Sequence, residues 1–84
     1  MYLLGKCYEQ GKGVKQDYAK ARSLYEKAAQ RTDHVGAPAM VYLGDMYAKG
    51  LGVVVDTAKA KAWYQKAAVT GNLDAIEALK EIGG

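Results

Sequence analysis

The sequence repeats itself at a spacing of 39 residues, and this duplication restricts the fold to one built from copies of a single small unit. When residues 4–29 are laid on residues 43–68, 14 of the 26 aligned positions are identical. They include a Leu-Gly pair, two tyrosines, a Gly-x-Gly-Val segment, an aspartate and a Lys-Ala-Ala segment. A third copy begins at Asn72, at an offset of 36, because the connection after the first unit is three residues longer. The chain therefore holds two full units and the start of a third.

Each unit has the pattern of a helix, a Gly-x-Gly-Val turn and a second helix. In the second unit Pro38 suits the first helical position, and Gly50 can take the left-handed conformation that ends a helix extending to about Lys49. Asp56, like Asp17 in the first unit, stands where its carboxylate can accept the free backbone N–H groups of the second helix. These signals predict an all-α protein of about five helices.

We predict a single domain over the 84 residues, with one repeat at about 1–36, a second at about 37–71 and a terminal helix at about 72–82. The terminal helix would pack through an apolar stripe and turn a charged outer face to solvent. The stripe comprises Ala75, Ile76, Leu79 and Ile82, and the outer face comprises Glu77, Lys80 and Glu81.

A glycine lies in the middle of each first helix, where it costs roughly 1 kcal/mol relative to alanine. These residues are Gly5 and Gly44, which occupy the same register of the two units. We expect the missing side chain to let the partner helix approach closely, with the ring of Tyr25 or Tyr64 across the glycine. In the second unit, the second helix is predicted to have a buried stripe of Ala60, Trp63, Tyr64, Ala67 and Ala68.

The second unit closely resembles the Sel-1-like repeat, a relative of the tetratricopeptide repeat. The matching residues are the segment Leu43-Gly-Asp-Met-Tyr-Ala-Lys-Gly-Leu-Gly-Val, then Asp56, Lys59-Ala, Trp63-Tyr, Lys66-Ala-Ala and Gly71. The resemblance covers nearly the whole chain. It implies antiparallel helix pairs stacked into a right-handed superhelix, a solenoid, and a role as a protein-binding adaptor or scaffold. Members of the family include bacterial proteins that interact with hosts or partner proteins.

The chain departs from the family pattern at a few positions. Leu24 stands where Trp63 stands in the second unit, and the connection before Pro38 is long. The cysteine-rich bacterial branch of the family links each helix pair by a disulfide, for which this chain has no cysteine pair. Cys7 occupies the position of Met46, so we expect it to be buried as a small apolar group.

The polar sector of the first helices is the candidate partner-binding surface, because solenoids line their concave side with these helices. In the second unit this sector holds Tyr42, Asp45 and Lys49. Their counterparts in the first unit are Leu3, Lys6 and Gln10. A solvated surface without a binding role explains the same pattern. The hypothesis is that a protein or peptide partner binds here.

Four lysines recur in the same register of the second helices and give an alternative function. They are Lys20, Lys27, Lys59 and Lys66. Such a row could attract a polyanion or a nucleic acid, although a net charge of +3 is no nucleic-acid signature. The simpler interpretation is that their stems cover aromatic edges while the ammonium groups reach water, with a cation–π contact to Trp63.

Catalytic motifs are missing from the sequence. His34 lies in the irregular connection without a Cys or Ser partner at a motif spacing, and the Gly-x-Gly turns lack the Lys-Ser/Thr of a phosphate loop. One Cys and one His cannot complete a zinc site. We therefore expect a protein that is not an enzyme and that uses no cofactor, metal or catalytic residue.

The ends of the sequence predict a fragment of a longer array, because the first helix starts about one turn late and the last has no partner helix. An uncovered end could pair with another copy, end to end. No apolar run is long enough to cross a bilayer, so we expect no membrane insertion. The compartment stays open: export would require a signal that this stretch of sequence lacks.

Overall fold

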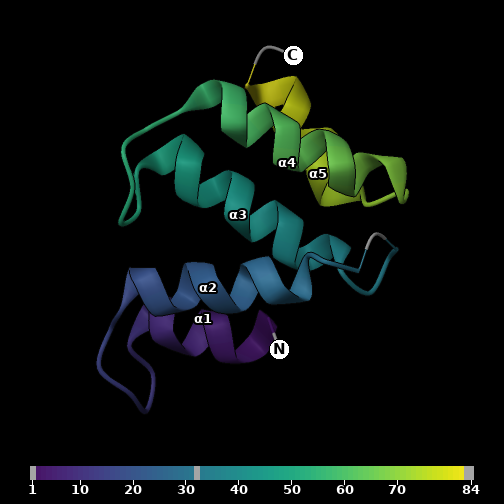
Figure 1. The fold of residues 1–84 in the computed structure, drawn as a ribbon. Coiled ribbons are helices and arrows are strands. Elements are labelled where there is room, and N and C mark those ends of the chain that lie inside the picture. Colours follow the sequence, from purple (N-terminus) through teal and green to yellow (C-terminus); the bar gives the residue numbers. More distant parts are fainter. Residues whose placement is uncertain (1, 32, 83–84) are drawn as a thin grey trace.

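Five helices follow one another along the chain, joined by turns, in a computed structural model that describes residues 2–31 and 33–82. They are α1 (Tyr2–Gln10), α2 (Tyr18–Ala28), α3 (Ala37–Lys49), α4 (Thr57–Val69) and α5 (Leu73–Glu81). Each helix packs mainly on its neighbours in the chain, so the helices stack in chain order from α1 to α5 (Figure 1). No strand occurs in the described ranges. The predicted all-α helical repeat is confirmed.

The helix ends follow the signals in the sequence. The carboxylates of Asp17 and Asp56 each accept a backbone N–H three residues on, at 3.0 Å. Asn72 caps α5 in the same way. Gly50 ends α3 with a φ of 70°, a left-handed conformation that a residue with a side chain rarely takes. The helix α3 begins at Ala37, so Pro38 lies second in the first turn rather than first.

The core is centred on α3, which packs between α2 and α4. Seven of its residues are buried: Ala37, Ala39, Met40, Val41, Leu43, Gly44 and Met46. Leu43 is fully buried, whereas Leu4, its counterpart on α1, is 49% exposed. The difference arises because α1 packs mainly on one helix, α2, while α3 is covered on two sides.

Both mid-helix glycines lie directly beneath a tyrosine ring. A Cβ atom at Gly44 would lie 2.5 Å from Cε1 of Tyr64, and one at Gly5 would lie 2.6 Å from Cε1 of Tyr25. Real Cβ atoms do not approach carbon this closely, so a side chain would displace the ring. The predicted close approach is confirmed in both units.

The predicted buried stripe of the second helix is confirmed only in part. Ala60, Tyr64 and Ala67 are buried, as expected, whereas Trp63 and Ala68 are half-buried against the same core. Trp63 precedes Tyr64 by one position, about 100° around the helix, which turns part of its ring toward solvent.

Two expectations about burial were wrong at the ends of the stack. Ile76 is 36% exposed rather than packed, and Ala78 takes its place beside Ala75 on the face of α5 that meets the core. Cys7 is half-buried, unlike Met46 at the same register, because α1 lacks the second packing partner of α3.

Candidate functional site

The candidate site is the first-helix face, defined by Lys6 and Gln10 of α1 and Tyr42, Asp45 and Lys49 of α3. The structure brings four of these side chains into two neighbouring places. Lys6 and Tyr42 meet where α1 faces α3, and Asp45 and Lys49 line a groove between α3 and α5. Gln10 is exposed at the last residue of α1.

Where α1 faces α3, a lysine lies over a cluster of tyrosines. The Lys6 ammonium is 4.3 Å from the ring centroid of Tyr42 and 4.0 Å from the carboxylate of Glu9. The Tyr42 ring is tilted against those of Tyr2 and Tyr25, with centroids 5.9 and 5.3 Å away. Burial among these rings raises the pKa of the Tyr42 hydroxyl. The contact combines a cation–π interaction with an ion pair.

Each buried tyrosine donates its hydroxyl to a carboxylate on the first helix. Tyr64 donates to Asp45 at 2.5 Å, and Tyr25 donates to Glu9 at 2.8 Å. Burial, and then the neighbouring carboxylate, raise the pKa of both hydroxyls above the usual value of 10.0. Tyr25 and Tyr64 occupy the same position in the two repeats. Their carboxylate partners do not: Asp45 aligns with Lys6, so Glu9 lies one helical turn further along its helix.

A groove of about 290 Å³ opens between α3, α4 and α5, and we call it the α3–α5 groove. Its lining consists of Asp45, Ala48, Lys49, Tyr64, Ala78, Glu81 and Ile82. The lining therefore combines two carboxylates and a lysine with a tyrosine and the apolar side chains of two alanines and an isoleucine. Of these residues, Asp45 and Lys49 alone were predicted to take part in the site. Glu81 was assigned to the outer face of α5. In the repeat alignment, however, Glu81 corresponds to Asp45 at an offset of 36, and this correspondence could have revealed its place in the groove.

Three of the four lysines in the alternative basic surface lie over aromatic rings of their own unit. The ammonium groups of Lys20 and Lys59 are 5.4 and 5.3 Å from the ring centroids of Tyr8 and Tyr47. Lys66 is 4.8 Å from the ring centroid of Trp63, which is the contact expected from the sequence. The fourth, Lys27, lines a different cavity beside Tyr2.

Charge is divided between the two kinds of helix. The second helices, α2 and α4, carry six basic side chains and one acidic one. The first helices, α1, α3 and α5, carry five acidic side chains and three basic ones. The positive net charge of the chain therefore resides on the second helices, while the first helices are net acidic.

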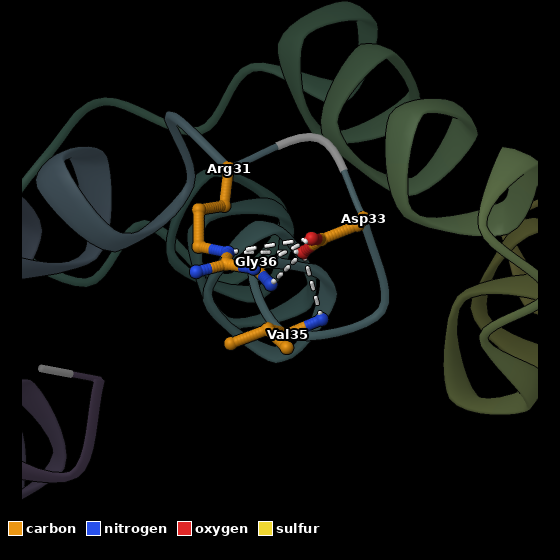
Figure 2. Close-up of polar contacts among 4 residues, drawn as sticks. All are labelled: Arg31, Asp33, Val35 and Gly36. Carbon is orange, nitrogen blue, oxygen red and sulfur yellow. Dashed lines mark hydrogen bonds and ion pairs between the residues drawn. The ribbon is translucent and has the colours of Figure 1, made fainter.

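The long connection before α3 is organised by one aspartate. Asp33 accepts hydrogen bonds from Arg31 Nη2 at 2.9 Å, from the Val35 backbone N–H at 3.0 Å and from that of Gly36 at 3.3 Å (Figure 2). These donors, Arg31 above all, lower the pKa of Asp33 to about 2. His34, in the same connection, is exposed.

Neither a metal centre nor a membrane span is found in residues 2–31 and 33–82. These ranges hold no group of three or more His, Cys, Asp or Glu side chains that could hold a metal ion. None of their helices combines the length and apolar character needed to cross a bilayer.

Comparison with known proteins matches this chain to a family model and to a solved structure. A family model described as the Sel1 repeat matches residues 1–33 and 37–68. A crystal structure of a Sel1 repeat protein from Oxalobacter formigenes is 46% identical to this chain, with a TM-score of 0.85. The match covers 96% of this chain and 23% of that one, so this chain spans less than a quarter of the length of the solved protein. No curated protein matches the sequence.

Proposed function

The chain belongs to the Sel1 repeat family, and from this premise we propose that it binds a protein or a peptide on the first-helix face. Sel1 repeats are generally protein–protein interaction modules, and the family is a non-enzymatic scaffold type. The chain would then act as a non-catalytic adaptor. Its partner is a protein or a peptide.

The observation that carries this proposal is the α3–α5 groove beside the exposed end of Lys49. Its lining holds both apolar and charged side chains, the combination that gives a binding surface both contact area and specificity. Tyr42 and Lys6 continue this surface toward α1, with an aromatic ring and a cation in contact. A bound peptide could lie across both places.

Binding of a polyanion or nucleic acid to the second helices is the alternative. It is favoured by the excess of basic side chains on α2 and α4. The side chains of Lys20, Lys59 and Lys66 already lie over aromatic rings, as expected when long side chains cover apolar surface. That packing role explains their recurrence without a ligand, so we favour the first-helix face.

A peptide selection on the purified chain tests the proposal. Dodecapeptides displayed from a random library would be selected on the immobilised protein and then titrated into isotopically labelled chain. We expect the backbone amide signals of Tyr42, Asp45 and Lys49 to shift. The substitution Lys49→Glu should change the Kd by about threefold or more, whereas Lys27→Glu, a matched reversal on α2, should leave it unchanged.

Two results would contradict the proposal. Shifts confined to α2 and α4, with binding that disappears between low and moderate salt, would assign recognition to the basic surface instead. Failure of the library to yield any specific binder would argue against a peptide-binding role altogether.

A further inference from the structure

The α1–α3 contact and the α3–α5 groove occupy equivalent positions in successive units of the repeat. Residues of α1 correspond to residues of α3 at an offset of 39, and residues of α3 to those of α5 at an offset of 36. Lys6 thus corresponds to Asp45, and Tyr42 corresponds to Ala78.

In the first place the chain supplies its own cation. The Lys6 ammonium lies over the Tyr42 ring at 4.3 Å and beside the Glu9 carboxylate at 4.0 Å. Glu9 also accepts the hydroxyl of the buried Tyr25. The position between the two first helices is therefore occupied by a lysine whose charge is balanced by the carboxylate that holds the tyrosine.

In the second place a tyrosine is again paired with a carboxylate, but Asp45 stands where the first unit has Lys6. Asp45 accepts the Tyr64 hydroxyl, and Glu81 lies close enough to help raise the pKa of that hydroxyl. Within the described ranges no ion pair involves Asp45 or Glu81, even though Lys49 also lines the groove. The ring of Tyr42 is replaced by the methyl group of Ala78, which leaves the groove open.

We propose that the α3–α5 groove receives a lysine or arginine side chain from the bound partner. The cation would lie between the carboxylates of Asp45 and Glu81, and its aliphatic stem would lie on Ala48, Ala78 and Ile82, as such stems do on apolar surface. The volume of about 290 Å³ lies at the lower limit of small-molecule pockets and suits one long side chain rather than a folded element.

The charge of the first helices supports a basic partner. Together α1, α3 and α5 bear five acidic and three basic side chains, so a cationic segment is attracted to these helices and repelled by the basic second helices. This inference rests on the proposed function, because it specifies the partner of the same face. It adds one requirement: a basic residue at one position of the bound peptide.

The selected peptides provide the test. We expect them to share a lysine or arginine, and replacing it by norleucine should weaken binding by about fivefold, the limit for one partly exposed ion pair. Glu81→Gln should weaken the lysine peptide by a similar factor and have little further effect on the norleucine peptide. Glu77→Gln removes the same charge from α5 outside the groove and should change the Kd little.

Asp45→Asn is a second variant, since an amide oxygen still accepts the Tyr64 hydroxyl while the charge is lost. Circular dichroism checks that each variant is folded. If Asp45→Asn does not fold, the effect of Glu81→Gln on the Kd alone tests the inference. Two results would overturn this inference and leave the proposed function in place. One is a set of peptides that shift first-helix signals without sharing a basic residue, and the other is a Kd that is the same for Glu81→Gln and the parent protein. If no peptide binds the first-helix face, both fail.

Discussion

Tyr64 donates its hydroxyl to Asp45 at 2.5 Å while its ring covers Gly44, so one side chain joins α4 to α3 by a hydrogen bond and by close packing. Tyr25 does the same in the first unit, with Glu9 as the acceptor and Gly5 beneath the ring. The two units therefore share the tyrosine and the glycine but place the carboxylate one helical turn apart.

Removing the Tyr64 hydroxyl should destabilise the protein. We expect Tyr64→Phe to lower the free energy of unfolding by about 1–2 kcal/mol, because a partly buried hydrogen bond to a charged acceptor is lost and the ring is kept. Tyr25→Phe should cost a similar amount. Urea denaturation followed by circular dichroism measures both, and Tyr18→Phe provides a comparison at a half-buried tyrosine outside the two pairs. Equal midpoints for Tyr64→Phe and the parent protein would contradict the assigned bond.

Stability should fall at alkaline pH because of the same tyrosines. Folding raises the pKa of Tyr25 and Tyr64 above the usual 10.0, so the folded state keeps both hydroxyls protonated where the unfolded chain ionises them. Their contribution is complete below pH 10 and is lost as the pH rises above it. The difference in unfolding free energy between the parent and Tyr64→Phe should therefore shrink above about pH 10. A difference that grows with pH would have the wrong sign.

Asp33 should remain ionised in unusually acidic solution. Its pKa of about 2 lies below the usual 3.8, so the hydrogen bonds that it accepts persist above that value and are lost as the pH falls through about 2. The amide signals of Val35 and Gly36 report this titration by nuclear magnetic resonance. Arg31→Gln should move the midpoint toward 3.8, while Lys12→Gln, in the turn after α1, should not. An unchanged midpoint in Arg31→Gln would argue against the ion pair as the cause.

Self-association through the α1 end is a prediction that a hydrodynamic measurement can decide. Leu3 and Leu4 of α1 are 66% and 49% exposed, whereas Leu43, the counterpart of Leu4, is fully buried. Sedimentation should show an average mass that rises with concentration, because burying these leucines against a second copy removes apolar surface from water. Leu4→Lys should abolish the rise, and Val69→Lys, at an 88% exposed apolar residue on α4, should not. A monomer at every concentration would refute it.

The sequence was sufficient for the helices and their pairing because both depend on local signals that occur twice. Asp17 and Asp56 cap, Gly50 ends a helix, and the glycine beneath each tyrosine is required by sterics. The repeat alone could not predict how exposed equivalent side chains are in the two units. Leu4 and Leu43 have the same sequence context, but their burial depends on what stacks against the helix.

The candidate site was predicted less completely for a related reason. Tyr42, Asp45 and Lys49 could be placed on one face of a helix from their spacing, but the α3–α5 groove also depends on the side chains of another helix. Glu81 was therefore assigned to the outer face, although its register matched that of Asp45. Whether a lysine finds a ring, as Lys6 does, depends on the separation of two helices, which periodicity does not give.

Placing a methyl group at Gly44 should separate close packing from helix propensity. Alanine favours a helix by about 1 kcal/mol over glycine, so Gly44→Ala would stabilise the protein if nothing lay over the site. Its Cβ would instead lie 2.5 Å from a Tyr64 ring that is buried and held by Asp45, so we expect a net loss of about 1–2 kcal/mol. In a Tyr64→Leu background the same change should cost less or stabilise, as measured by urea denaturation of the four proteins in the cycle. Identical costs in both backgrounds would show that the ring and the glycine are not coupled.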